Sequence, residues 1–260
     1  NRILHTDTAL WAWIFFVIRW ELSLFAQTFF MHRYATHAMF QMSKKSEEFW
    51  YKFAGYTMGS SYLSPYAYAL LHTMHHMHAD KDGDPHPARA YRGLFGFIPL
   101  MKKTLFWYRK CRAREGTIVA SYHKKHFPDH ISLDERFHNW KWRMMWVLVY
   151  IAFYILFVPF GFVWLLLIGH FFMGPIHGII INYMGHKVGY QNYEENDCDA
   201  TNIPGISLIM QGENHHDNHH GDQHDPNFAR RWWEFDPTYQ IIRFLAWRRK
   251  IFLYPNMLKI

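Results

Sequence analysis

The residues best suited to chemistry in this sequence are its histidines. The chain has 20 His among 260 residues, and many of them stand in short clusters. Three clusters are clear: His32-Arg-Tyr-Ala-Thr-His37, His72-Thr-Met-His75-His76 and His216-Asp-Asn-His219-His220. Because imidazole is the commonest metal ligand among side chains, the first chemistry that these clusters suggest is a metal centre.

The spacing within the clusters indicates how the rings are presented. The second and third clusters have His at i, i+3 and i+4, on one helix face, so each is expected to aim three imidazoles at one point. In the first cluster the two His are five residues apart, about 140° around an ideal α-helix, and are not expected on one narrow stripe. A fourth element, Asn182-Tyr-Met-Gly-His186, places Asn and His at i, i+4.

The number of candidate ligands indicates two metal ions. An isolated His is more often a hydrogen-bonded core or surface residue, but repeated ligand spacing favours the metal interpretation. Eight or nine candidate ligands exceed what one four- to six-coordinate ion uses. Imidazole also suits zinc, copper and nickel, so the spacing does not identify the metal.

Long apolar segments must position these clusters. Residues 144–185 contain no Asp, Glu, Lys or Arg, enough for two crossings of about 20 residues each, with a turn at Pro159-Phe160-Gly161. Residues 8–31 would form another crossing, although they contain Arg19 and Glu21. Charges inside a membrane usually face protein or water. A partly buried amphipathic helix is the alternative for 8–31.

The net charge of +7 is concentrated outside the apolar segments. The connector 102–143 and the carboxyl-terminal part are rich in Lys and Arg, which predicts that both are cytoplasmic. Nucleic-acid binding is not favoured, since no recognised module accompanies these charges. Cys111 and Cys198 have no metal-ligand spacing and are expected to be free thiols.

Residues 53–71 are the difficult segment, because they are uncharged and long enough to cross. If they crossed, the first two clusters would face opposite compartments and could not share a centre. Their Gly, Ser and Pro content instead predicts an interfacial or protein-covered segment.

The ordered elements resemble those of the integral-membrane fatty acid desaturase superfamily, in particular its stearoyl-CoA-desaturase-like branch. That branch has HxxxxH, HxxHH, NxxxH and HxxHH in the same order, and the likeness runs from about Phe29 to Trp247. It includes Asp84-Pro85-His86, Gly212-Glu213 and Arg231-Trp232-Trp233. The resemblance implies that nine His bind two irons, with Asn182 bound through a water. These are His32, His37, His72, His75, His76, His186, His216, His219 and His220.

The fold that follows is all-α, with three membrane crossings at about 8–31, 144–162 and 163–185. A cytoplasmic helical cap, 32–143 and 186–260, would hold the di-iron site, and residues 1–260 would form one desaturase domain. Family members usually have two crossings before the first cluster, so one crossing is expected to be absent from this chain. His78, His215 and His224 lie outside the family pattern, and His78 and His224 are not expected to be ligands.

The function implied by the resemblance is oxygen-dependent insertion of a double bond into a fatty acyl chain, most readily an acyl-CoA. Arg89 and Arg92 are candidate contacts for a phosphate-bearing head group, or ordinary surface residues. The sequence has no electron-carrier motif, so a ferredoxin, a rubredoxin or a cytochrome-b5-type protein would supply the electrons.

Three alternatives remain open. The same metal core would serve a hydroxylase or another lipid oxidase. A non-catalytic, His-rich membrane protein for metal binding or transport would also carry such clusters. A carboxylate di-iron bundle would use the pairs Glu135/His138 and Glu213/His216, but would leave most of the clustered histidines unexplained.

Overall fold

Helices form nearly all of the regular structure. The structure, a computed structural model, describes residues 2–194 and 198–254. Its elements are α1 (Arg2–Phe25), the π-helix η1 (Ala26–Thr36), β1 (Phe40–Gln41), α2 (Lys44–Met58), η2 (Gly59–Ser61), α3 (Pro65–His78), η3 (Ala88–Ala90), α4 (Phe97–Arg112), α5 (Gly116–Tyr122), α6 (Ile131–His138), α7 (Trp140–Phe157), η4 (Phe162–Trp164), α8 (Leu165–Phe171), α9 (Met173–Asn182), η5 (Met184–His186), α10 (Ser207–Met210), α11 (His216–Gly221), α12 (Pro237–Trp247) and β2 (Phe252–Leu253). The predicted helical class is confirmed.

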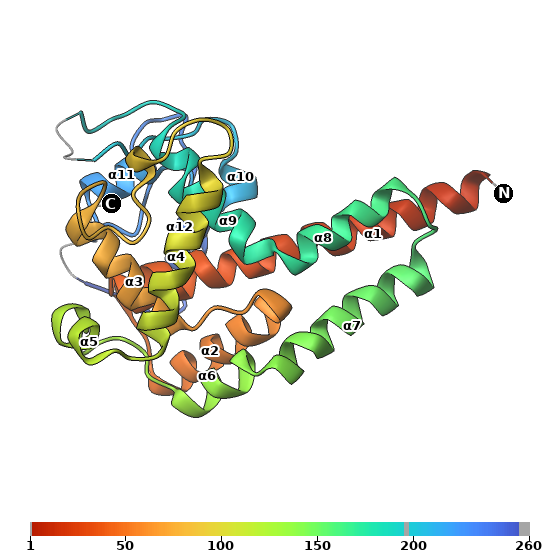
Figure 1. The fold of residues 1–260 in the computed structure, drawn as a ribbon, viewed down its shortest axis with the longest axis horizontal. Coiled ribbons are helices and arrows are strands. Elements are labelled where there is room, and N and C mark those ends of the chain that lie inside the picture. The colour runs from red at the N-terminus through yellow and green to blue at the C-terminus, as the bar shows by residue number, and fades with distance from the viewer. Residues whose placement is uncertain (1, 195–197, 255–260) are drawn as a thin grey trace.

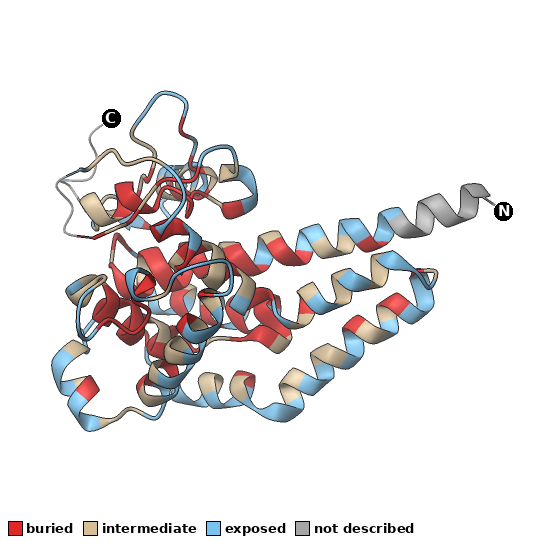
Figure 2. Ribbon diagram, turned by 45° about the horizontal axis from the view of Figure 1, so that its top comes forward, coloured by how far each residue is buried: buried red, intermediate tan, exposed pale blue. Residues whose placement is uncertain are grey.

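Among the described residues, two helices are long and apolar enough to cross a membrane, Leu10–Thr36 and Trp140–Phe157. A bent pair, Phe162–Phe171 with Met173–His186, would make a third crossing. Helices α1, α7 and α8 project together from the rest of the molecule (Figure 1). Only 11 % of the Trp140–Phe157 window is buried, and exposed residues line much of these helices (Figure 2). Such an apolar outer surface suits lipid contact.

The third predicted crossing, 163–185, is not the single helix that its composition suggested. Its two halves meet at 78° around Phe172. Pro175 explains the break, because in a continuous helix its ring would clash with the carbonyl of Phe171, four residues earlier. The first crossing also differs from its predicted bounds, since the helix continues past Met31 to Thr36 as η1.

Arg19 faces the protein, as intramembrane charges are expected to do. Its side chain is 9 % exposed and donates to the carbonyls of Tyr56 and Thr57 in the last turn of α2, and to the hydroxyl of Tyr150. A cation at the carboxyl end of a helix satisfies terminal carbonyls and the helix dipole. Arg19 therefore joins α1 to α2 and α7.

The segment 53–71 is divided and largely covered by protein. Helix α2 ends at Gly59, whose φ of +55° a residue with a side chain rarely adopts. Helix α3 then starts with Ser64 as its N-cap and Pro65 in its first turn, a strong helix-start signal. This break agrees with the expectation that 53–71 is not a crossing, because neither half is long enough to span a bilayer.

Candidate metal centre

The first histidine cluster lies on a π-helix. The backbone N–H of His37 donates to the carbonyl of His32 over 3.2 Å, the five-residue bond that defines this helix type. The two ring centroids are consequently only 5.0 Å apart. The angular separation expected from an ideal α-helix was therefore wrong here, because the helix changes from α to π winding before His32.

Arg33 fixes this turn against the carboxyl-terminal part of the chain. It is fully buried, and its guanidinium lies 2.7 Å from a carboxylate oxygen of Asp236 and 3.9 Å from the ring centre of Phe228. Asp236 is also the N-cap of α12. The residue beside His32 thus anchors η1 within the core.

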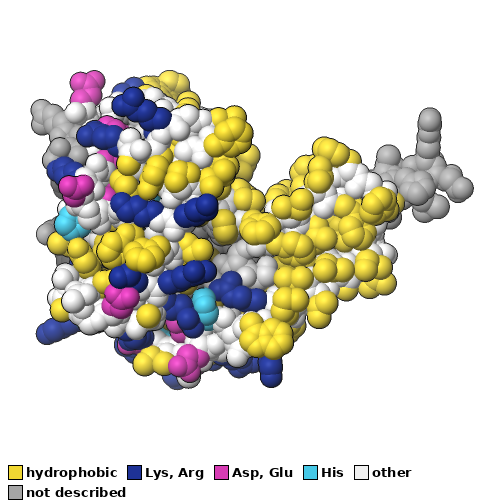
Figure 3. All heavy atoms as spheres, in the orientation of Figure 1, with side chains coloured by type: hydrophobic (Ala, Val, Ile, Leu, Met, Phe, Trp, Pro, Cys, Tyr) yellow, Lys and Arg dark blue, Asp and Glu magenta, His cyan; other side chains and the backbone are white. Residues whose placement is uncertain are grey.

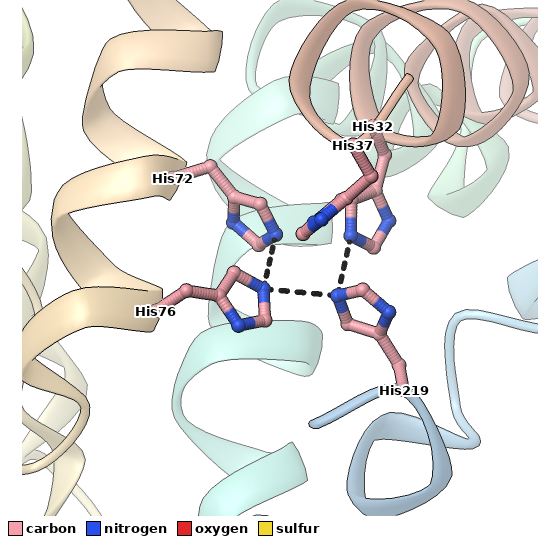
Figure 4. A group of neighbouring side chains, drawn as sticks. All are labelled: His32, His37, His72, His76 and His219. Carbon is pink, nitrogen blue, oxygen red and sulfur yellow. Dashed lines mark hydrogen bonds between the residues drawn. The ribbon is translucent and has the colours of Figure 1, made fainter. Parts of the chain in front are cut away.

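Nine of the predicted histidines come together in two groups. The first group is His32, His37, His72, His76 and His219, and the second group is His75, His186, His216 and His220. Within each group, one ring nitrogen per residue lies within 4.8 Å of all the others. Figure 4 shows the imidazoles of the first group, which come from η1, α3 and α11, pointing toward one another.

Helices α3 and α11 each contribute to both groups. His72 and His76 of α3 join the first group, while His75 between them joins the second. The arrangement is reversed in α11, where His216 and His220 join the second group and His219 joins the first. The expectation that each cluster aims three rings at one point is therefore corrected, because residue i+3 points to a different centre from i and i+4.

The two groups are neighbours. The ring centroids of His76 and His220, one from each group, are 4.5 Å apart. Since His75 and His76 are also adjacent in the chain, the groups form two halves of one buried cluster.

Carboxylates orient three of the nine rings. Nδ1 of His32 lies 2.7 Å from Glu213, Nδ1 of His75 lies 3.0 Å from Asp84, and Nδ1 of His186 lies 2.9 Å from Asp80. A carboxylate at Nδ1 accepts the ring proton and leaves the lone pair on Nε2. These Nε2 atoms point to other imidazoles, in His219, His220 and His216 respectively.

Burial keeps the remaining six rings neutral. It lowers the pKa values of six imidazoles well below their usual range, and neighbouring imidazoles lower them further. These six are His37, His72, His76, His216, His219 and His220. A neutral imidazole retains the lone pair that a metal ion needs.

The spacing of the ring nitrogens fits metal coordination. Contacts between Nε2 atoms are 2.9 Å for His32–His219, His72–His76 and His76–His219. In the second group they are 3.0 Å for His186–His216, 3.2 Å for His216–His220 and 3.3 Å for His75–His220. Metal–imidazole bonds of about 2.0–2.1 Å at angles between tetrahedral and square would separate ligand nitrogens by roughly 2.9–3.4 Å. Lone pairs that meet at this distance are compatible with a shared cation.

The other predicted site residues lie around this cluster. Asn182 is the last residue of α9, half-buried, and precedes His186 by four residues. Arg89 forms a two-point ion pair with Asp199, and its backbone N–H donates to Asp80. Arg92 is exposed. The substrate-contact role of these two arginines therefore stays a prediction.

The extra histidines lie outside both groups. His78 contacts the hydroxyl of Tyr122 over 3.0 Å, His224 is exposed, and His215 contacts the carbonyl of Phe235 over 3.1 Å. The carboxylate-bundle alternative used the pair Glu213/His216. The Glu213 carboxylate contacts Nδ1 of His32 and belongs to neither histidine group.

Several supporting residues were not identified as such from the sequence. Asp80, Asp84 and Glu213 hold ring protons, and Sγ of Cys198 lies 3.5 Å from Nδ1 of His220. Cys198 is buried, and neither it nor Cys111 forms a disulfide, as expected. His86 stacks on His75 at 4.3 Å between ring centroids. The only signal was that Asp84, His86 and Glu213 stand in fragments that resemble the desaturase pattern.

Comparison with known proteins gives the same family over most of the chain. The fatty acid desaturase family model matches residues 8–251. A Delta-9 desaturase-like 4 protein of Arabidopsis thaliana is 26 % identical over 231 residues, covering 88 % of this chain and 71 % of the relative. An sn-1 stearoyl-lipid 9-desaturase of Anabaena variabilis is 25 % identical, covering 82 % and 72 %. An Acyl-CoA C20 Delta5-desaturase of Anemone leveillei is 24 % identical, covering 90 % and 70 %.

The family match, the apolar helices and the gathered histidines agree with one another. The resemblance that the histidine spacing suggested is thereby confirmed, and the chain belongs to the fatty acid desaturase family.

Proposed function

We propose that this protein is a di-iron desaturase that inserts a double bond into a fatty acyl chain. The observation that carries the proposal is the convergence of nine histidines into groups of five and four. Iron is favoured over zinc, copper or nickel by the desaturase family, since imidazole alone would accept any of them.

The residues of this chain would hold and tune the metal pair. When bound, the two irons would supply the oxidising power that removes two hydrogens from an alkyl chain, with O₂ and two external electrons. The imidazoles of the first and second groups would be the ligands. Glu213, Asp84 and Asp80 keep the proton of three rings on Nδ1, and their burial with the rings limits water around the cluster.

Asn182 is proposed to hold a water in the second group. That group has four histidines where the first has five, so one ligand position would be left for a further donor. Asn182 closes α9 immediately before η5, which carries His186. Its amide can accept and donate hydrogen bonds, as an ordering partner for a water requires.

The acyl carrier and the electron donor are proposed from chemistry rather than from contacts. The relatives include proteins named for acyl-lipid and for acyl-CoA substrates, so either carrier is compatible, with acyl-CoA as the primary proposal. Electrons would come from a separate ferredoxin, rubredoxin or cytochrome-b5-type protein.

A multi-pass arrangement with the metal cluster on the cytoplasmic side is part of the proposal. The basic connector 102–143, which runs from within α4 to the start of α7, supports it through the positive-inside tendency. Single cysteines introduced at exposed sites of this connector would report the side, because Cys111 and Cys198 are buried. Labelling from the opposite face would contradict this topology.

The function is tested by the lipids of cells that express the protein. Wild type is expected to produce acyl chains lighter by two mass units, whereas His219→Ala is expected to produce none. His224→Ala is the matched control, because His224 is exposed and outside both groups. A gain of sixteen mass units would instead identify a hydroxylase. Tightly held zinc without an oxygen-dependent product would favour a metal-binding or transport protein.

A further inference from the structure

Helix α4 runs across the direction of the projecting helices rather than along it (Figure 1). Because α1, α7 and α8 point along the long axis of the molecule, α4 would lie roughly parallel to the plane of a membrane that they cross. It packs on α3 and on α9, which is half of the bent candidate span. Helix α4 is therefore placed where the protein would emerge from the bilayer.

The two faces of α4 differ in character. Leu100, Tyr108 and Cys111 are buried, and Met101 approaches Gly178 of α9. On the outer face, Ile98, Leu105 and Phe106 are 44 %, 46 % and 54 % exposed. Exposed apolar side chains on a helix at this position favour contact with the acyl boundary of a membrane.

Basic residues alternate with the exposed apolar ones. A groove of about 550 Å³ along α4 is lined by Lys102, Leu105, Phe106, Arg109, Lys110, Ala113 and Glu115. Nζ of Lys110 lies 5.0 Å from the ring centre of Phe106 and 3.2 Å from Glu115, the one acid in this lining. Lys and Arg side chains mix with hydrophobic ones over the face where Figure 1 places α4 (Figure 3).

We infer that this outer face of α4 is a binding site for the phosphate groups of anionic phospholipids. Long basic side chains can lie along an apolar surface and extend their charge to the head-group layer. The three cations outnumber the one acid of the lining, Glu115, and so leave this face net positive. This charge would select anionic over zwitterionic lipid, since each uncompensated cation is worth about a fivefold preference near a charged surface. The apolar residues between them distinguish this face from an ordinary docking surface for an acidic protein. The inference depends on membrane insertion and not on the desaturation reaction.

The inference is tested by the lipids that stay with the purified protein. Wild type is placed in bicelles of equal phosphatidylcholine and phosphatidylglycerol, purified, and its retained lipids are quantified by mass spectrometry. Retained phosphatidylglycerol is expected to be enriched, and K102Q/R109Q/K110Q is expected to reduce the enrichment at least about tenfold. The control K45Q/K125Q/R248Q removes the same charge at exposed positions on other segments and should retain the enrichment.

A second measurement locates the helix directly. Leu105→Cys is labelled with a fluorophore, since Cys111 and Cys198 are buried. Brominated phosphatidylglycerol should quench the label more strongly than brominated phosphatidylcholine, and this difference should vanish when the three cations are neutralised. A label that neither lipid quenches would overturn the inference. Unchanged lipid enrichment in the triple variant would also overturn it. A raised KM for the electron donor in that variant would then identify a protein-docking surface.

Discussion

His32 of η1 and Glu213, 181 residues later, meet in the core with the ring Nδ1 2.7 Å from a carboxylate oxygen. Both side chains are almost fully buried, and Thr28 also donates to this carboxylate. The contact joins the end of the first candidate crossing to the segment before α11. It decides which nitrogen of His32 carries the proton.

Glu213→Gln is expected to weaken metal binding while leaving the helices intact. The amide can still reach His32, but it no longer fixes the proton on Nδ1. Loss of such a partner typically costs about 10–100-fold in metal affinity. Titration of the metal-free protein with Fe²⁺, followed by circular dichroism, separates affinity from folding. Glu48→Gln is the control, because Glu48 pairs with Lys52 on the exposed face of α2; equal affinities in the two variants would contradict the assigned role.

His220→Ala is expected to remove one of two metal ions. His220 belongs to the second group only, so the first group keeps its five histidines. Iron per chain should fall from about two to about one, measured by elemental analysis. His78→Ala, which removes a histidine that contacts Tyr122, should retain both ions. Loss of all iron from the His220 variant would mean that the groups do not bind metal separately.

Gly59→Ala is expected to destabilise the junction of α1, α2 and α7. An added Cβ would come within 2.2 Å of the Tyr150 hydroxyl and 3.0 Å of the Arg19 guanidinium, at a φ of +55°. Backbone strain and displacement of Arg19 together should cost about 1–3 kcal/mol. Thermal unfolding in detergent would measure this loss.

Two glycines provide controls for that variant. Gly93 has φ of +75° with open space around it, so Gly93→Ala reports the backbone strain alone. Gly116 has open space and no such φ, so Gly116→Ala should be nearly neutral or slightly stabilising. Equal melting temperatures for all three variants would contradict the tight packing assigned to Gly59.

Glu47→Gln is expected to reduce stability at neutral pH and to match wild type in acid. Burial alone would raise the pKa of Glu47, but hydrogen bonds from Tyr34, Lys44 and His130 hold it below the usual 4.5. A carboxylate with a lowered pKa contributes stability above its unfolded pKa and loses it as pH falls through the folded value. The difference of about 1–3 kcal/mol should therefore shrink below about pH 4.5. Denaturant unfolding of metal-free protein across pH 3–7 would show it, and a constant difference would refute it.

Arg89→Gln and Arg92→Gln should have different effects. Arg89 is held by Asp199, whose backbone N–H donates to Asp80. Because Asp80 also contacts the His186 ring, loss of Arg89 should disturb His186 and lower iron retention. Arg92 is exposed, and a head-group contact there would raise KM for acyl-CoA several-fold with little change in kcat. Unchanged kinetics in the Arg92 variant would leave Arg92 an ordinary surface residue.

The sequence predicted which histidines gather at the site better than it predicted how they are arranged there. Residue type and clustering identified all nine histidines that gather. The i, i+4 pairs His72/His76 and His216/His220 each stay in one group, as a shared helix face requires. The pairing of His32 with His37 was not predictable from ideal geometry, since it depends on a π-helix. The division of α3 and α11 between two groups, and the carboxylates of Asp80, Asp84 and Glu213, depend on how distant segments pack.

For the apolar segments too, the sequence predicted the location better than the three-dimensional arrangement. Absence of charge located the apolar stretches, but Pro175 breaks the last of them into α8 and α9 at 78°. The interruption at Gly59 was indicated by composition, whereas the capping of α2 by Arg19 required the tertiary structure.

The winding of η1 has a mechanical consequence. Because α1 passes into η1 without interruption, the first candidate crossing is one rod that carries His32 and ends at the C-cap His37. A bilayer that is thinner or thicker than this rod prefers would change its tilt. Such a tilt would shift two imidazoles of the first group against those on α3 and α11. Bilayer thickness would thereby change the distances between the imidazoles of the first group.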